Sequence, residues 1–210
     1  VIASVAPSFP AAFPEYGGGL LVAALKQLGF KLVTETAVGA ELVAAATADL
    51  LDNNKSYGWI TSACPVVVNI IEKYYSSATE KITPIISPMV AHARYLKNKY
   101  GHSSKVIFIG PCSAKKGDAE DDSQKSVDAV LTFEELRQML VEENINRANL
   151  KPITFDDVRP SKAQLFPLEG GLAETASISS ELISESFAAL SGPHQVLEMI
   201  ENALGDSSVK

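Results

Sequence analysis

The chain has 210 residues and a mass of 22.4 kDa, with 46% hydrophobic and 20% charged residues, and this composition excludes a disordered or fibrous protein. Lysine and arginine number 18 against 25 acidic residues, and the resulting net charge of −7 excludes a basic nucleic-acid-binding surface. Two cysteines are too few for a disulfide-rich secreted domain, and no apolar run reaches the roughly 18–20 residues of a membrane span.

Apolar runs alternate with helical periods through the first half of the chain, which is typical of a parallel α/β fold. Glycines are expected to close two of the helices, and Pro65 stands in the first turn of another, where its missing N–H costs nothing. The predicted strands are 1–6, 30–34 and 57–61, and the predicted helices are 17–28, 39–51, 65–75 and 88–100. We therefore expect a first α/β lobe over residues 1–102.

The second half repeats the alternation and predicts a second α/β lobe over residues 103–210, so that each lobe has its own mostly parallel sheet flanked by helices. Thr132 and Glu135 have the spacing of a capping box at a helix start. The acidic run 118–122 is expected to be a solvated connection. The predicted strands are 105–109 and 127–131, and the predicted helices are 113–120, 132–143, 170–177 and 195–204.

Both cysteines occupy the same kind of position, because Cys64 and Cys112 each follow a predicted buried strand and precede a predicted helix. Ligands gather at the carboxyl ends of parallel strands, and a helix N-terminus stabilises a thiolate. Two thiolates facing one crevice are one interpretation, and two small buried core residues are the other. Lys115 follows Cys112 at an offset that would attract an anionic ligand to the crevice, unless it is a solvated surface lysine.

The histidines show no metal-binding spacing with each other or with the cysteines (His92, His102 and His194). An isolated histidine is more often a surface or packing residue than a ligand. Because a structural metal site usually has four ligands, any metal at the two cysteines needs ligands from outside this chain.

Several segments, in the same order, resemble the catalytic domain of iron-only ([FeFe]) hydrogenases over nearly the whole chain. Residues 61–65, Thr-Ser-Ala-Cys-Pro, resemble the family's T-S-C-C-P motif, and residues 110–116, Gly-Pro-Cys-Ser-Ala-Lys-Lys, resemble its M-P-C-x-x-K motif. Residues 6–8, 87–88 and 166–171 resemble further family segments. The resemblance implies two α/β lobes with the active cluster in the cleft between them.

The resemblance also implies a cofactor, the H-cluster, in which four cysteines hold a [4Fe–4S] unit and one of them bridges to a two-iron unit carrying CO and cyanide. Cys64 and Cys112 match the first two metal ligands. The other two come from a C-terminal motif, and the chain ends at Lys210 before any such motif. We therefore expect a C-terminally truncated fragment of a longer protein, inactive by itself and without a complete cluster.

Five further residues match positions that surround the two-iron unit in the family. The cofactor-binding segment Ala6-Pro7-Ser8 supplies two of the roles, because Pro7 and Ser8 match residues that hydrogen-bond a cyanide. Lys115 matches the lysine that faces the other diatomic anion, and Phe166 matches a residue that lines the two-iron pocket.

One departure bears on turnover, because Ala63 replaces the cysteine that passes protons in the standard enzymes, and alanine cannot transfer a proton. This predicts a sensory-type member of the family, which senses H2 or slowly converts it to protons and electrons. The cytoplasm is the default expected location. Expected partners are a redox protein or fused iron–sulfur or signalling domains, with no nucleic acid and no membrane span. Two alternatives stay open: a fully competent hydrogenase with a different proton route, and a cluster-free binding or scaffold module of the same fold.

Overall fold

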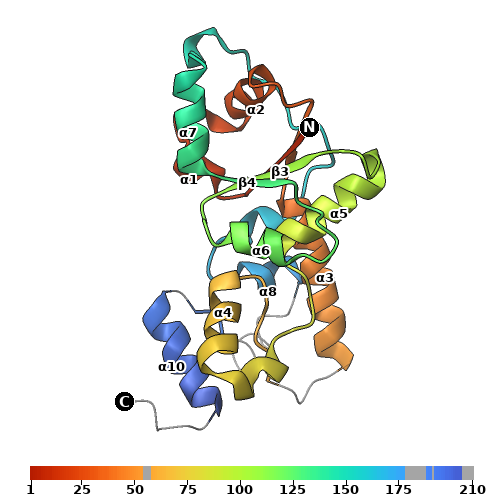
Figure 1. Cartoon of the computed structure of the whole chain (residues 1–210), viewed down its shortest axis with the longest axis vertical. Coiled ribbons are helices and arrows are strands. Elements are labelled where there is room, and N and C mark those ends of the chain that lie inside the picture. Colours follow the sequence, from red (N-terminus) through yellow and green to blue (C-terminus); the bar gives the residue numbers. More distant parts are fainter. Residues whose placement is uncertain (54–57, 178–187, 191, 205–210) are drawn as a thin grey trace.

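The computed structural model describes residues 1–53, 58–177, 188–190 and 192–204. A four-stranded, all-parallel sheet in the order β2-β1-β3-β4 forms the centre of the fold (Figure 1). Its strands are β1 (Ile2–Val5), β2 (Leu32–Glu35), β3 (Val106–Gly110) and β4 (Ala129–Thr132). Four of the five predicted strands are thus confirmed, with ends displaced by one or two residues.

Helices cover both faces of this sheet. In Figure 1, α1, α2 and α7 lie above it, and α5 lies below it with α3 packed against α5; α4 and α10 lie together at the other end of the molecule. The helices are α1 (Phe9–Ala12), α2 (Gly17–Gln27), α3 (Ala37–Asn53), α4 (Pro65–Tyr74), α5 (Pro88–Tyr100), α6 (Lys115–Asp121), α7 (Phe133–Glu142), α8 (Gly171–Thr175) and α10 (Pro193–Leu204). Three short 3-10 helices are η1 (Ser76–Lys81), η2 (Arg147–Asn149) and η3 (Lys162–Leu165). None of these helices is long and apolar enough to cross a membrane.

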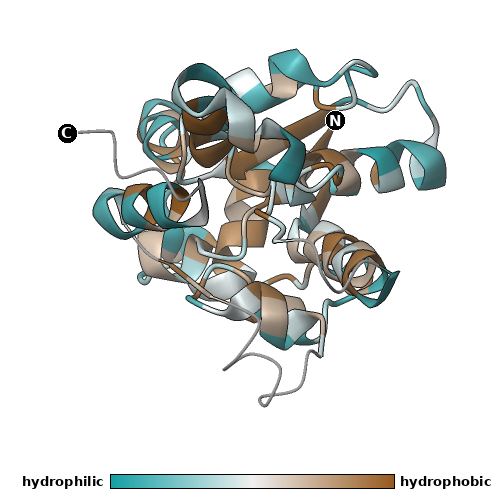
Figure 2. Cartoon of the chain, turned by 90° about the horizontal axis from the view of Figure 1, so that it is seen from below, coloured by the Kyte–Doolittle hydropathy of each residue, from teal (hydrophilic) through white to brown (hydrophobic). Residues whose placement is uncertain are grey.

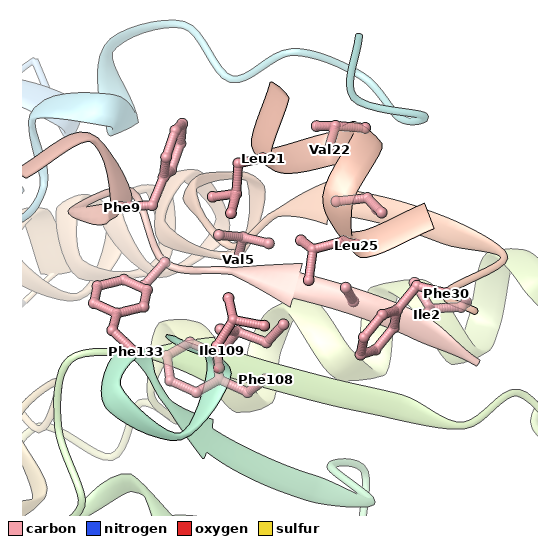
Figure 3. Packing of buried hydrophobic residues seen from close by; sticks show 14 of the residues in the cluster. Ile2, Val5, Phe9, Leu21, Val22, Leu25, Phe30, Phe108, Ile109 and Phe133 are labelled. Carbon is pink, nitrogen blue, oxygen red and sulfur yellow. The ribbon is translucent and has the colours of Figure 1, made fainter. Parts of the chain in front are cut away.

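The main core packs α2 and α7 on one face of the sheet and α5 on the other. Val5 and Ile109 from neighbouring strands pack against Leu21 and Leu25 of α2, and all four are fully buried (Figure 3). Burying each such side chain contributes roughly 1.5–3 kcal/mol. The hydrophobic segments therefore gather inside while hydrophilic segments face outward (Figure 2), as continuous apolar runs in parallel strands predict.

The expectation of one sheet in each half of the chain was wrong for the described residues. The sheet takes β1 and β2 from the first half and β3 and β4 from the second, with Ile2 in register with Val106. Of the predicted strand 57–61, residue 57 lies outside the described residues, and only Ile60 pairs, in a single parallel bridge with Ile82. Because β1 is buried along its whole length, it needs a neighbouring strand on each side. Hydrophobic periodicity predicts this need, but it does not identify β3 of the second half as one of the two neighbours.

Candidate functional site

The carboxyl ends of β1 and β3 bring the segments 6–8 and 110–112 together. The amide of Ala6 donates to the carbonyl oxygen of Ile109 at 2.8 Å, and Ala6 is 6% exposed. A Cβ at Gly110 would lie 3.2 Å from the Ala6 Cβ and 2.5 Å from the Phe108 ring. A side chain at 110 would therefore push these segments apart, and glycine allows their close approach.

The two cysteines sit in different settings, although both are free. Cys112 is half-buried just after β3, and its carbonyl oxygen accepts from the amide of Lys115 at 3.3 Å. Cys64 is exposed and is the N-cap of α4, with Pro65 in the first turn. The expectation that each cysteine follows a buried strand was therefore wrong for Cys64, which follows a turn after the single bridge at Ile60.

Lys115 joins the segments that carry the two cysteines. Its Nζ donates to the carbonyl oxygen of Ala63 at 3.0 Å, one residue before Cys64, and pairs with Asp118 Oδ2 at 2.7 Å. The Lys115 side chain is 13% exposed and that of Asp118 is 20% exposed, so water screens the pair only in part. One largely buried lysine thus contacts the segments of two cysteines that are 48 positions apart in sequence.

Asp118 is a site residue that the sequence reasoning missed. Its Oδ2 also accepts from the hydroxyl of Ser87 at 2.7 Å, which ties α6 to the N-cap of α5. The sequence does contain a signal for this ion pair, because Lys115 and Asp118 have the i, i+3 spacing that places two side chains on one helix face.

The acidic run 118–122 is not the solvated connection that was expected, because α6 extends through Asp121 and Asp122 is 7% exposed. Burial raises the pKa of the Asp122 carboxyl, but bonds from the amide of Ser126 and the guanidinium of Arg94 outweigh this and hold it at about 2. The segment after the site lysine is therefore anchored to α5 at both ends.

The loop before Cys64 is held by hydroxyl groups. The Ser62 amide donates to Thr83 Oγ1 at 3.1 Å, and the two hydroxyls lie 3.0 Å apart. The Ser62 hydroxyl also donates to the carbonyl oxygen of Ile85. These bonds position the first cysteine segment against residues 83–87, which lead into α5.

Phe166, which follows η3, packs against the first turn of α3. Together with Ala163 it contacts Ala37 and Ala40. Its segment is tied to that helix because Glu41 Oε1 accepts from the amide and the hydroxyl of Ser161, at 2.5 and 2.8 Å. Behind it, a Cβ at Gly171 would collide with the carbonyl oxygen of Leu165, so only glycine fits. The structure thus places Phe166 on α3 and the cysteine segments around α4 and α6.

A buried carboxyl stands near this segment. Glu35 is 5% exposed at the end of β2, and Gln164 Nε2 donates to its Oε1 at 3.3 Å. Burial raises the pKa of Glu35, which the bond from Gln164 and the charge of Arg159 partly offset. Glu35 therefore keeps its proton to a higher pH than an exposed glutamate.

The donor set fits part of a thiolate-held iron–sulfur group. The segments that carry the two free thiols both contact Lys115, but no group of three His, Cys, Asp or Glu that could hold a metal exists among the described residues. A [4Fe–4S] cluster has four cysteine ligands. The chain can therefore supply two of the four.

Comparison with known proteins identifies one family over nearly the whole chain. The family described as iron only hydrogenase large subunit, C-terminal domain, matches residues 1–207. The chain is 28% identical to Iron hydrogenase 1 of Clostridium pasteurianum, over 89% of this chain and 37% of that protein. It is 27% identical to the NADP-reducing hydrogenase subunit HndD of Solidesulfovibrio fructosivorans, over 84% of this chain and 36% of that protein.

A more distant relative is the cytosolic Fe-S cluster assembly factor NAR1 of Yarrowia lipolytica, which is 23% identical over 83% of this chain and 39% of that protein. Among solved structures, an apo form of the [FeFe]-hydrogenase HydA1 from Chlamydomonas reinhardtii aligns with a TM-score of 0.71 and 25% identity, covering 90% of this chain and 55% of that chain. A HydA structure on stepwise H-cluster assembly aligns equally well. The chain thus spans just over a third of these curated relatives and about half of these solved structures.

Proposed function

Because the chain belongs to the family of C-terminal domains of iron-only hydrogenases, we propose that it is part of a protein that binds an H-cluster and senses H2, or slowly converts it to protons and electrons. The observation that carries this proposal is the bond from Lys115 Nζ to the carbonyl oxygen of Ala63, which brings both cysteine segments to one cation. The partners in this proposal are a redox protein or fused iron–sulfur or signalling domains, and the location is the cytoplasm.

Each matched residue has one task in this proposal. Cys64 and Cys112 hold the [4Fe–4S] unit together with two cysteines from outside this chain. Lys115 pairs with an anionic ligand of the two-iron unit, because a half-buried ammonium stabilises an anion within reach. Ala6, Pro7 and Ser8 hold a second anionic ligand beside it, and Phe166 lines the pocket of the two-iron unit. When bound, the cluster supplies the redox chemistry.

Slow turnover is the part of the proposal that rests on Ala63. A positioned acid or base contributes about 10²–10⁴-fold to a proton transfer, and a methyl group supplies none of this. In the longer, cluster-loaded protein, Ala63→Cys should therefore raise H2 evolution by about 10²-fold or more. An unchanged rate would instead favour a competent hydrogenase with another proton route.

Cluster binding is tested separately from turnover. The longer protein, matured with its cluster, should show CO and cyanide infrared bands, and Cys64→Ser or Cys112→Ser should remove them and lower the iron content. Ser62→Ala serves as the matched control, since it changes a hydroxyl beside Cys64 and removes no thiol. Bands that persist in both cysteine variants would refute the ligand assignment.

A cluster-free binding module is the second candidate, and one observation favours it. Asp118 already pairs with Lys115 at 2.7 Å, so the cation has an internal anionic partner and is stable without an external one. In this case iron would not be incorporated by the longer protein even after reconstitution with iron and sulfide. Iron analysis of that protein separates the two candidates.

A further inference from the structure

A line of buried hydroxyl and imidazole groups crosses the fold away from the cysteines. Thr36 Oγ1 lies 2.7 Å from Ser4 Oγ, and Ser4 Oγ lies 2.7 Å from His92 Nδ1. The three residues are 3%, 1% and 0% exposed. They come from the turn after β2, from β1 and from α5, so three parts of the fold contribute to one hydrogen-bonded line.

The line begins next to the site. The amide of Thr36 donates to the carbonyl oxygen of Val5 at 2.9 Å, and Ala6 follows directly. His92 reaches Ser4 because α3 and α5 cross closely at Gly39, where a Cβ would collide with the carbonyl oxygen of Pro88 and approach the His92 Cβ to 2.6 Å.

The other end of the line approaches the protein surface at a carboxylate. His92 Nε2 and Asp157 Oδ2 are both buried without a protein hydrogen-bond partner, and the two groups influence each other electrostatically. The Tyr95 ring stacks on His92 at 6.0 Å, and its hydroxyl donates to Asp157 Oδ1 at 3.5 Å. Asp157 Oδ1 also pairs with Lys99 at 2.5 Å, and the lysine side chain is 41% exposed.

Burial of these groups adds little to stability. A hydrogen-bonded polar pair in a core contributes about as much as apolar side chains of the same shape, and each unpaired buried atom costs about 1–3 kcal/mol. Hydroxyl, imidazole and carboxyl groups do, however, pass protons, which no apolar side chain does. That capacity is what distinguishes this line from an ordinary core.

We propose that Asp157, His92, Ser4 and Thr36 form a proton route between the protein surface and the carboxyl edge of the sheet, where residues 6–8 enter the site. The inference rests on the proposed function, since a site that converts H2 must exchange protons with solvent. Such a route would carry protons in a chain in which Ala63 cannot transfer them.

Each step of the route breaks one O–H or N–H bond and forms another, and the passage of one proton leaves His92 in its other neutral tautomer. A proton on the Asp157 carboxyl passes through one ordered water, the usual partner of buried polar atoms that lack a protein partner, to His92 Nε2. The Nδ1 proton of His92 then moves to Ser4 Oγ, the Ser4 hydroxyl proton moves to Thr36 Oγ1, and the Thr36 hydroxyl proton passes to a water at the carboxyl edge of the sheet. Movement in the other direction reverses the same bonds, and no oxidant or reductant is needed.

The route predicts fast hydroxyl exchange at a buried threonine. Deuterium exchange of threonine hydroxyls is measured by NMR on this chain as isotope shifts at Cβ. Thr34 is the matched control, because it is 0% exposed and its hydroxyl donates to the Ala3 carbonyl oxygen at 2.7 Å, outside the line. The Thr36 hydroxyl should exchange about 10²-fold faster than that of Thr34, the lower end of what positioned acid–base groups supply.

Two variants decide whether that exchange uses the proposed route. Asp157→Asn at the surface end and His92→Phe in the middle should each slow Thr36 exchange to the rate of Thr34 and leave Thr34 unchanged. Asp157→Asn keeps the inference testable if His92→Phe does not fold. Equal exchange of Thr36 and Thr34 in the unmodified chain, or fast Thr36 exchange in Asp157→Asn, overturns the route.

This exchange experiment needs no cluster, so it is independent of the proposed function. Absence of CO and cyanide bands in the longer protein would refute the proposed function, but it would not change the measured exchange rates of Thr36 and Thr34. In a longer protein that carries the cluster, Asp157→Asn should lower H2 evolution while the infrared bands persist. An unchanged rate there would count against the route alone.

Discussion

Acidification should destabilise this chain through one buried imidazole. Burial lowers the pKa of His92 to about 4, although nearby Asp157 raises it, while the unfolded chain has the ordinary value of 6.5. Below pH 6.5 the unfolded state therefore binds a proton that the folded state does not, so stability falls as the pH drops from 6.5 to 4. The full effect is about 3 kcal/mol, of which about 1 kcal/mol is already lost at pH 5.5.

The assay is urea unfolding followed by circular dichroism between pH 7.5 and 5.5, a range in which few carboxylates titrate. His92→Gln keeps an amide near Ser4 but removes the titrating group, so its free energy of unfolding should vary less with pH by about 1 kcal/mol. At pH 7.5 the variant should be less stable by roughly 1–3 kcal/mol, because the bond to Ser4 is disturbed. His102→Gln is the matched control at an exposed position. If His92→Gln and the unmodified chain show the same pH dependence, the imidazole does not titrate as argued.

Three further outcomes are expected from chemical denaturation of variants at pH 7.5. Gly39→Ala should destabilise the chain by about 1–3 kcal/mol, because the added Cβ collides with backbone at the α3–α5 crossing. Gly117→Ala in α6 should instead stabilise the chain by about 0.5–1 kcal/mol, because its Cβ meets no atom within 4 Å. Equal effects of the two substitutions would contradict the crossing geometry. Thr132→Ala should cost about 1 kcal/mol through the lost α7 capping box, and no loss would mean that the cap is dispensable. In a double-mutant cycle, Lys115→Met and Asp118→Asn should couple by about 0.5–3 kcal/mol, whereas additive losses would show that the ion pair contributes nothing.

Local features were predictable because their causes lie within a few residues. The side chain of Thr132 accepts from the amide of Glu135 at 3.1 Å, and the Glu135 carboxylate returns a bond to the Thr132 amide, so the capping box needs no distant partner. The apolar run at residues 1–6 had to be a buried strand for the same kind of reason. The segments carrying Cys64 and Cys112 were found by their resemblance to family motifs, which are local as well.

Long-range pairings had no such signal. The run at 57–61 has the same apolar character as a sheet strand, yet only Ile60 pairs there among the described residues. The expected solvated run 118–122 became a helix end with buried Asp122, because Arg94 lies beside it only after α5 and α6 meet. Asp118 was likewise assigned to solvent until α6 placed it on Lys115.

The sequence by itself determined the segments of β1 to β4 and of most of the helices, where α7 is capped, and which residues match the iron-only hydrogenase motifs. Each of these depends on hydrogen bonds and hydrophobic periods within a few residues. Only the tertiary structure decided that β1 lies between β2 and β3, that Lys115 reaches Ala63, and that His92 bonds Ser4 across 88 positions. Such contacts depend on how packed elements share one core, and the chain order alone does not encode that choice.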